Sequence, residues 1–437
     1  MSYLKKTGLA LTLGLALALT PAPSPGTDSP AAFPTCESAS FVDQSLRPLQ
    51  LSAQTYHYVD EDEEGVLLRT SSTLLIFQGS PHEAPALQQA LWHYNTEKAA
   101  AHDQLRQEML KNAKEFRAEM KAARADYFPA HESNSLIYIR RSDTLAVSLL
   151  EFGSGYYGGA HDMYGVYGRN FDSRTGKELT LADVFADQQA LTKAIIKQLQ
   201  QDYPQASFME SGGIISLEET VKQMVKDGSL PWTLDPWGAS FYFNPYAIGS
   251  YMEGIFTATI CFDEAPELFQ EKYRHAPASC CVELMPYQSQ RLALGKGRKA
   301  TLHVGQGEKG LLVAMDSKAL EEPGEARELR PVLVSLADGR AYLYVDALED
   351  GQLWEKTRVY DLTGKSPRRV PMEKHFTRRA DIPEDYRSIT KDTKPSKTFY
   401  IMADPGHFQL SELDKYGLRH LRVCRAGKDG APEIVRP

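Results

Sequence analysis

The stretch FDSRTGKELTLADVF, residues 171–185, holds the end of a strand, a turn and the start of a helix. Thr175-Gly176 predicts a reversal between two extended segments, because glycine adopts turn conformations that other residues avoid. Thr180 and Asp183 have the spacing of a capping box, in which each side chain bonds to the other residue's backbone N–H. We therefore expect a helix to begin at residue 180, with a buried face made of Val184, Phe185, Leu191, Ile195 and Leu199.

Upstream of this stretch, the apolar pattern predicts a long helix preceded by a hairpin. Residues 51–59 and 73–77 alternate as strands do, on either side of a solvated acidic turn at residues 60–65. Apolar residues then recur at spacings of three, four or their sums over residues 86–125. This spacing indicates one helix packed on a sheet through Leu87, Leu91, Leu105, Met109, Phe116 and Met120.

Further strands surround the opening stretch. Residues 136–152 predict two strands joined by a turn at residues 141–143. The Gly-rich residues 153–159 predict a tight turn into a strand at residues 163–171, and residues 240–262 predict two more strands. Strands and helices follow one another without the regular alternation of a parallel sheet, so we expect an α+β fold with antiparallel sheets and a long packed helix.

The C-terminal part has a different pattern, that of a β-meander. Residues 332–334 and 342–345 are apolar and flank Asp338-Gly339, which is a strong hairpin signal. Asp350-Gly351 and Thr363-Gly364-Lys365 repeat the turn chemistry further along the chain. We expect a β-rich domain here, and both a small sandwich and a pair of propeller-like blades fit the pattern.

The first 35 residues have the layout of a secretory signal peptide and a Pro-rich linker. Lys5 and Lys6 form a positive start, residues 9–19 form an apolar run, and residues 21–34 are rich in Pro, Ser and Gly. The run is shorter than the ~20 residues of a spanning helix, and no later stretch is apolar enough to span. We therefore expect an exported protein (periplasmic, in the cell envelope or extracellular) with no transmembrane segment after signal removal.

Charge and cysteine usage restrict the partners. The formal net charge of −8 argues against sequence-independent nucleic-acid binding, which requires clustered Lys and Arg. In an oxidising compartment some cysteines should pair, and an odd number leaves one over. A disulfide from Cys261 to Cys280 or Cys281 is one candidate, but the sequence leaves the pairing open among Cys36, Cys261, Cys280, Cys281 and Cys424.

The glycine and acidic patterns do not complete a cofactor or metal site. Gly153, Gly155 and Gly158 match the glycines of a dinucleotide site, but the helix that must start at the third glycine is missing. The acidic turn at residues 60–65 begins like a calcium loop, yet Ser71 stands where the bidentate glutamate belongs. The cysteines also lack the paired spacing of a zinc site. We therefore expect no cofactor and no metal.

His161, followed by Asp162, is the candidate for acid–base catalysis, because it is the histidine in the most distinctive setting. Acid–base work needs a partner held within hydrogen-bond reach, and neither an H-E-x-x-H nor a G-x-S-x-G motif is present. The alternative is a hydrogen-bonded structural histidine in a Gly-rich turn, and we expect that one.

Three segments together resemble one family of bacterial envelope domains. They are GGAH at residues 158–161, the opening stretch at 171–185 and the aromatic FYFNPYAIG at 241–249. Their order and spacing resemble the RsiV-like ectodomain family, which occurs in lysozyme-sensing anti-sigma factors and ahead of some peptidoglycan deacetylases. The resemblance covers about residues 45–270, and its motif residues are Gly158, Gly159, Ala160, His161, Phe171, Asp172, Thr175, Gly176, Leu181, Asp183, Phe185, Tyr246, Ala247 and Gly249.

The resemblance implies a binding or sensing module whose halves are residues 36–150 and 151–285, with residues 290–437 as a β-rich domain of another kind. The signalling and catalytic parts of the relatives do not carry over. An anti-sigma factor needs a spanning helix and a cytoplasmic segment. A deacetylase needs clustered metal-binding histidines, whereas this chain has scattered ones at His303, His375, His407 and His420.

We therefore expect a non-catalytic exported protein that binds a cationic protein such as lysozyme, or a peptidoglycan component. One alternative is a cell-wall hydrolase that uses His161 and Asp162. Another is a structural envelope protein that interacts through its C-terminal β-rich domain.

Overall fold

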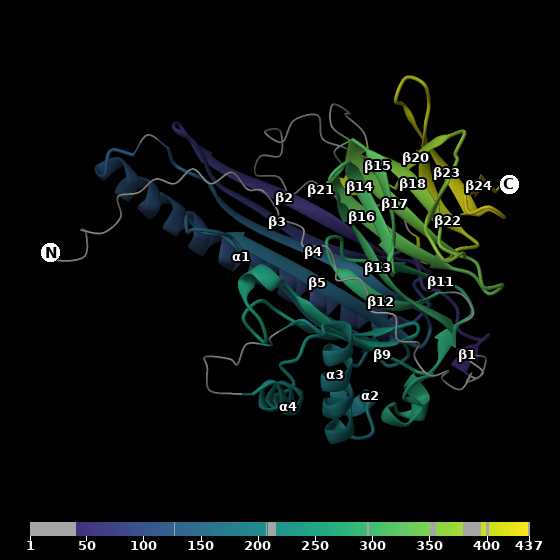
Figure 1. Ribbon diagram of the computed structural model, residues 1–437. Coiled ribbons are helices and arrows are strands. Elements are labelled where there is room, and N and C mark those ends of the chain that lie inside the picture. Colours follow the sequence, from purple (N-terminus) through teal and green to yellow (C-terminus); the bar gives the residue numbers. More distant parts are fainter. Residues whose placement is uncertain are drawn as a thin grey trace. The chain divides into compact units, whose positions relative to one another are not determined.

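The computed structural model describes residues 41–435, except 126, 207, 209–215, 295–296, 325, 350–354, 379–394 and 399–401. The expected signal peptide and linker, Cys36 and the turn at Asp350-Gly351 lie outside the described residues. Antiparallel sheets, a long helix and a β-rich C-terminal region confirm the expected α+β class (Figure 1). No helix of the described part is both long and apolar enough to cross a membrane.

The largest sheet has six strands and one long helix against it. Its elements are β2 (Leu51–Asp62), β3 (Gly65–Phe77), α1 (Pro85–Ala122), β4 (His131–Ser142), β5 (Ala146–Tyr156), β6 (Met163–Asp172) and β21 (Pro395–Thr398). The strand order is β21-β2-β3-β4-β5-β6. β3 and β4 are parallel, so α1 serves as the crossover between them and lies along the sheet (Figure 1). The turn predicted at residues 141–143 begins later, because Arg141 and Ser142 still pair within β4.

The expected long helix is confirmed, but its buried face differs from the predicted stripe. Leu105 is exposed, and Phe116 and Met120 are only half-buried. The side chains that α1 buries are Leu87, Leu91, Tyr94, His102, Met109, Ala113 and Arg117. Buried polar residues therefore replace part of the apolar stripe towards the C-terminal end of α1.

Ion pairs attach the second half of α1 to the β2–β3 hairpin. The pairs are Asp60 with Arg106, Asp62 with Arg117, and Glu64 with Lys121. Arg106 binds both carboxylate oxygens of Asp60, at 2.7 and 2.8 Å. Residues 61–64 are exposed, so the expected solvated acidic turn is confirmed, and basic residues of the helix pair with its carboxylates.

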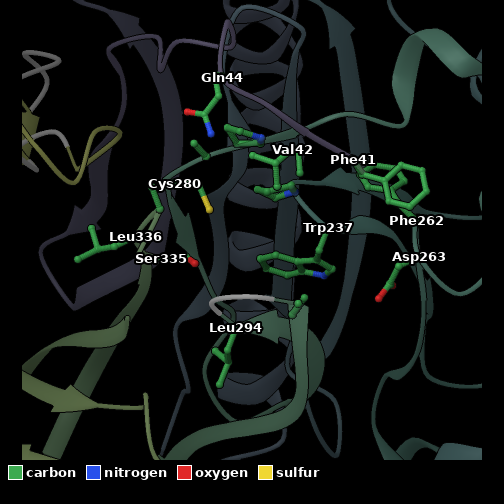
Figure 2. A pocket seen from close by; sticks show the side chains of 17 residues that line it. Phe41, Val42, Gln44, Trp237, Phe262, Asp263, Cys280, Leu294, Ser335 and Leu336 are labelled. Atoms are coloured by element: carbon green, nitrogen blue, oxygen red, sulfur yellow. The ribbon is translucent and has the colours of Figure 1, made fainter. Parts of the chain in front are cut away.

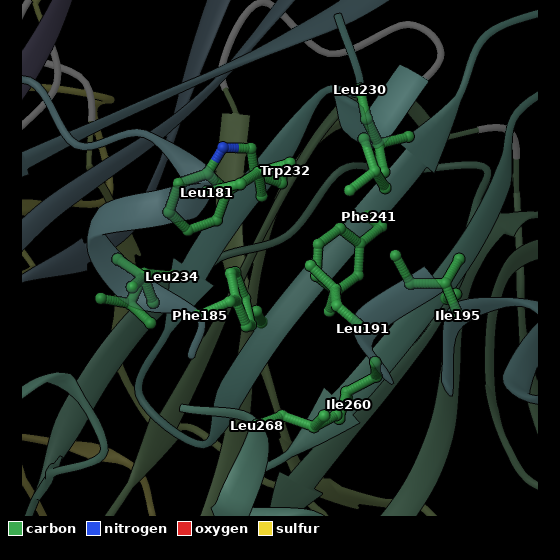
Figure 3. Packing of buried hydrophobic residues seen from close by; sticks show 14 of the residues in the cluster. Leu181, Phe185, Leu191, Ile195, Leu230, Trp232, Leu234, Phe241, Ile260 and Leu268 are labelled. Atoms are coloured by element: carbon green, nitrogen blue, oxygen red, sulfur yellow. The ribbon is translucent and has the colours of Figure 1, made fainter. Parts of the chain in front are cut away.

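The middle of the chain packs short helices on a three-stranded sheet. Its elements are α2 (Leu181–Val184), α3 (Gln188–Asp202), α4 (Leu217–Asp227), β7 (Trp232–Asp235), β8 (Gly238–Phe243), η2 (Tyr251–Glu253), β9 (Phe256–Cys261), η3 (Pro266–Leu268) and η4 (Glu271–Tyr273). The two strands predicted over residues 240–262 are β8 and β9, and β7 is a third that the sequence pattern did not predict. The sheet and helices enclose one apolar core (Figure 3).

The helix expected from residue 180 is present, but it is interrupted. The capping box forms, with Asp183 Oδ2 accepting from the Thr180 N–H at 2.9 Å. α2 then ends after four residues, because Phe185 is extended and forms a bridge with Phe269. Asp187 caps a new helix, α3. All the side chains predicted for the buried face are in the core: Val184, Phe185, Leu191, Ile195 and Leu199. Figure 3 shows Phe185, Leu191 and Ile195 among them.

The C-terminal part stacks three sheets. The central sheet contains β11 (Cys280–Glu283), β16 (Ala326–Ser335), β17 (Ala341–Glu349), β18 (Glu355–Asp361) and β19 (Arg368–Val370). One neighbour contains β12 (Ser289–Leu294), β13 (Arg298–Gln306), β14 (Gly310–Met315) and β15 (Lys318–Pro323). The other contains β20 (His375–Thr377), β22 (Phe408–Leu413), β23 (Arg419–Ala426) and β24 (Pro432–Ile434).

Both faces of the central sheet are buried, which explains its continuous apolar strands. Leu343 and Val345 pack towards the β12–β15 sheet, and the alternate residues Tyr342 and Tyr344 pack towards the β20–β24 sheet. The predicted meander is confirmed as β16-β17-β18-β19. The arrangement is a layered sandwich, and the domain limits expected from the sequence stay predictions.

A buried guanidinium connects three of these sheets. The Arg140 side chain in β4 is 1% exposed and donates to both carboxylate oxygens of Asp235 in β7, at 3.0 and 2.8 Å. It also donates to the amide oxygen of Gln290 in β12 at 2.7 Å. Buried charges are tolerated only when they are paired and hydrogen-bonded, and here the pairing holds separate sheets together.

The described cysteines form no disulfide. Cys261, Cys280, Cys281 and Cys424 are all free thiols. The disulfide considered between Cys261 and Cys280 or Cys281 is therefore not formed. Cys261 ends β9, whereas Cys280 and Cys281 begin β11 in a different sheet, and adjacent residues of a strand point to opposite faces.

Candidate functional site

Two of the three motif segments meet at one end of β6. The first is the turn at residues 157–162, which joins β5 to β6. Gly158 has a φ of +80°, and a Cβ there would lie 2.7 Å from the Phe116 ring of α1. The turn therefore needs glycine both for its backbone and for its close approach to α1. Gly153 and Gly155, which were expected in this turn, lie inside β5.

The second segment is the loop at residues 244–254, which follows β8. Asn244 binds the backbone of Val166 in β6 through both ends of its amide: Oδ1 accepts from the Val166 N–H at 2.7 Å, and Nδ2 donates to the Val166 carbonyl oxygen at 3.1 Å. Tyr246 adopts a φ of +68°, and its N–H donates to the Gly249 carbonyl oxygen at 3.0 Å. Asn244 thus fixes the loop on β6, and the tight turn after it presents Tyr246.

Together the two segments form what we call the aromatic platform: His161, Tyr164, Tyr246 and Tyr251. The Tyr251 ring is central, with centroid distances of 4.1 Å to His161, 5.4 Å to Tyr164 and 5.9 Å to Tyr246. Tyr246 is 53% exposed, and Met252, next to Tyr251 in the chain, is 90% exposed. Aromatic rings with a wet polar end are typical of binding surfaces.

Asp162 supplies the negative charge of the platform. The Tyr251 hydroxyl donates to the Asp162 carbonyl oxygen at 2.8 Å and approaches its carboxylate at 3.1 Å. Partial burial and this bond to Asp162 raise the pKa of Tyr251 to about 12. Burial and the same carboxylate raise the pKa of Tyr164. Both phenols are therefore neutral at physiological pH.

The catalytic candidates do not form a dyad. His161 Nδ1 lies 2.7 Å from the main-chain oxygen of Asp162, and both side chains are exposed. The histidine ring is thus engaged by its neighbour's backbone, and the Asp162 carboxylate interacts with Tyr251 instead. No group of three or more His, Cys, Asp or Glu side chains in the described residues is arranged to hold a metal ion.

The middle motif, residues 171–185, lies at the other end of β6, about 30 Å from the platform at ~3.3 Å per strand residue. Asp172 accepts from the Thr175 N–H at 2.9 Å and pairs with Lys272 and Tyr273. Burial alone would raise the pKa of Asp172, but the bonds from Lys272, Thr175 and Tyr273 outweigh it and lower the pKa to about 2. Its apolar members Phe171, Leu181 and Phe185 are buried. This motif therefore contributes to the scaffold and takes no part in the aromatic platform.

Some residues of the aromatic platform were predicted from the sequence and others were not. His161 and Tyr246 are motif residues, and the structure brings them together through Tyr251. Gly159 and Ala160 are exposed in the first turn, and Ala247 donates its N–H to the Asn244 carbonyl oxygen at 3.0 Å. Asn244, Tyr164 and Tyr251 were not singled out, although the Asn-Pro pair at 244–245 marks a turn.

The match to a known family lies in the middle of the chain. Residues 182–263 match the model of a family described as "Protein of unknown function (DUF3298)". Among curated proteins, no sequence matches this chain.

Among the solved structures that are similar to part of this chain are two DUF3298 proteins. One is the crystal structure of a DUF3298 family member from Bacteroides fragilis, 17% identical, with a TM-score of 0.40 over 51% of this chain and 94% of that one. The other is a DUF3298 family protein from Pseudomonas aeruginosa, 15% identical, with a TM-score of 0.35 over 52% of this chain and 97% of that one. The family match establishes that this chain carries a DUF3298 domain at residues 182–263.

Proposed function

We propose that this chain is an exported, non-catalytic binding protein of the bacterial cell envelope and that the aromatic platform is its contact surface. The observation that carries the proposal is the convergence of two motif segments, far apart in sequence, on one exposed aromatic cluster. Their scaffold holds Tyr246 in a φ of +68°, a conformation that costs energy in a non-glycine residue. Such a cost is expected where a side chain must be presented in one direction.

The proposed ligand is a cationic protein such as lysozyme. The motifs resemble those of RsiV-like ectodomains, and the chemistry of the platform is compatible with that ligand. Lys and Arg side chains bind the faces of tyrosine rings, and tyrosine is enriched in the central contacts of protein interfaces. The Asp162 carboxylate and the net charge of −8 would add electrostatic attraction, which mainly accelerates association.

Export is proposed from the sequence of the first 35 residues, with Lys5, Lys6 and the apolar run at 9–19 as support. A periplasmic, envelope or extracellular location follows from it. Binding of a peptidoglycan component is the second ligand that we consider, since sugar rings also stack on exposed aromatic side chains.

A binding titration with lysozyme at physiological salt, and a co-sedimentation assay with purified peptidoglycan, test the proposal. We expect Tyr246→Ala and Tyr251→Ala each to weaken lysozyme binding by tenfold or more, because truncation of a central aromatic contact costs about 2 kcal/mol. Tyr416→Ala is the matched control, since Tyr416 is 74% exposed in the turn between β22 and β23. Absence of binding to both ligands, or equal losses for Tyr246→Ala and Tyr416→Ala, would contradict the proposal.

A further inference from the structure

A cavity of about 430 Å³ lies among residues that the aromatic platform does not use (Figure 2). A short parallel pair borders it, made of β1 (Val42–Asp43) and β10 (Ala276–Pro277). The turn between β7 and β8, the end of β12 and the end of β16 contribute the other walls. Cavities of a few hundred Å³ are of the size that holds small-molecule ligands.

The walls of this cavity are more apolar than polar and carry little charge. Phe41, Val42, Phe262, Leu294 and Leu336 are among the side chains that line it. Among the described residues that line it, Asp263 is the one with a charged side chain, and it is paired with Lys299 at 2.8 Å. No Lys, Arg or His lines the cavity among the described residues, so a ligand with an anionic end would find no cation in the wall.

Trp237 lines the cavity with its indole ring, but the hydrogen-bond donor of that ring is closed off from solvent. Its side chain is buried, and Nε1 has no acceptor among the described residues. The Trp237 ring also lies beside the buried Arg140, whose guanidinium is 5.9 Å from the ring centroid, and this contact restricts the ring. The ring therefore adds apolar area to the wall, whereas Nε1 is not exposed to the cavity and is not a contact for a ligand.

Cys280 offers a way to observe the cavity. Its thiol projects from β11 among the lining side chains (Figure 2). Cys280 is half-buried, whereas Cys261, Cys281 and Cys424 are buried. A small thiol reagent therefore reaches Cys280 before the other described cysteines, and a ligand in the cavity would block it.

From the volume, the apolar walls and the lack of a cation, we propose that this cavity binds one uncharged lipid-like molecule. Its volume equals about fourteen water molecules at ~30 Å³ each, and a methylene group is close to water in size. The ligand is thus an acyl chain of about a dozen carbons with an uncharged polar end. The site is independent of the proposed lysozyme-binding platform.

The test measures how fast Cys280 of the full chain reacts with a small uncharged disulfide reagent, read by mass spectrometry of the Cys280 peptide. The probe is monolaurin, a neutral twelve-carbon ester, below its micelle concentration. We expect it to slow labelling of Cys280 tenfold or more at saturation, with Cys424 changed less than twofold. Laurate has the same chain with an anionic end, and it should need at least tenfold higher concentration for the same protection.

Two variants separate the cavity from general lipid adsorption. Ala293→Phe, which fills the lined space, should remove the protection, whereas Ala319→Phe on the exposed side of β15 should keep it.

Three results would overturn the proposal. They are a Cys280 rate that monolaurin changes less than twofold, protection that persists in Ala293→Phe, and protection by lipid vesicles but not by dissolved monolaurin.

Discussion

Asn244 is the residue on which the geometry of the aromatic platform depends most directly. Its amide bridges the N–H and the carbonyl oxygen of Val166 in β6, at 2.7 and 3.1 Å. Asn244→Asp keeps an acceptor for the Val166 N–H, but its second carboxylate oxygen faces the Val166 carbonyl oxygen. One hydrogen bond, worth about 1 kcal/mol, is lost, and an unfavourable oxygen–oxygen contact adds about as much or more. We therefore expect the loop at 244–254 to be destabilised locally by about 2–3 kcal/mol.

The Val166 amide itself reports this change, because its hydrogen exchange requires the bond to Asn244 to open. Since about 1.4 kcal/mol corresponds to a factor of ten, the exchange rate of Val166 should rise about 30-fold or more. The amides of Leu149 and Leu150, fully buried in β5, should be unchanged. Lysozyme binding should weaken at least tenfold, because Tyr246 and Tyr251 are no longer held in place.

Asn134→Asp is the matched control. Asn134 is exposed, and its Oδ1 accepts from the Ser71 hydroxyl at 3.3 Å, a role that an aspartate retains while adding the same negative charge. Val166 exchange within threefold of the unchanged protein in Asn244→Asp would refute the positioning role. Faster exchange with unchanged lysozyme binding would instead show that the platform is not the contact surface.

Three further predictions concern the core, pH and catalysis. Arg140→Met leaves Asp235 buried without its cation and should lower the free energy of unfolding by about 3–5 kcal/mol. Urea unfolding measures this loss, with Arg69→Met as the control, because loss of the half-exposed Arg69–Glu132 pair should lower the free energy of unfolding by less than about 1 kcal/mol. Equal losses for the two variants would contradict the prediction. Burial lowers the pKa values of His102 and His131 below the usual 6.5. The unfolded chain therefore binds more protons than the folded chain, and stability should fall as the pH drops below about 6.5. In thermal unfolding, His131→Phe should reduce the loss of stability between pH 7 and pH 5, and an unchanged pH dependence would contradict this. His161→Ala should leave the fold intact and weaken lysozyme binding, whereas loss of a cell-wall hydrolytic activity in this variant would favour the enzyme alternative.

Local signals in the sequence were sufficient to predict several structural elements. The capping box of Thr180 and Asp183 forms as predicted, and so does the meander that includes the turn at Thr363-Gly364-Lys365. The interruption at Phe185 was not predictable from periodicity, because it results from a bridge to Phe269, far along the chain. Likewise, the apolar pattern of α1 could not show that Arg106 and Arg117 would meet carboxylates of the β2–β3 hairpin.

The candidate site was predictable only in part, for the same reason. Motif resemblance identified His161 and Tyr246, but their proximity depends on Asn244 binding a residue 78 positions away. Tyr251 lies outside the quoted motifs and becomes central only through its contacts with His161 and Asp162. The cavity at Trp237 also combines segments that are separated by hundreds of residues, so no local pattern could predict it.

Two sheets are completed by a strand from a distant part of the chain, and this affects how the protein can be divided into fragments. β11 forms an edge of the central C-terminal sheet by pairing with β16, while β21 extends the six-stranded sheet by pairing with β2. A C-terminal fragment that starts at residue 290 would lack β11. The backbone N–H and C=O groups of β16 that pair with β11 would then be free to bind other chains, next to the apolar Val332 and Val334. Unpaired apolar edges promote aggregation, so poor behaviour of such a fragment would reflect a severed sheet and would say nothing about which half binds a ligand.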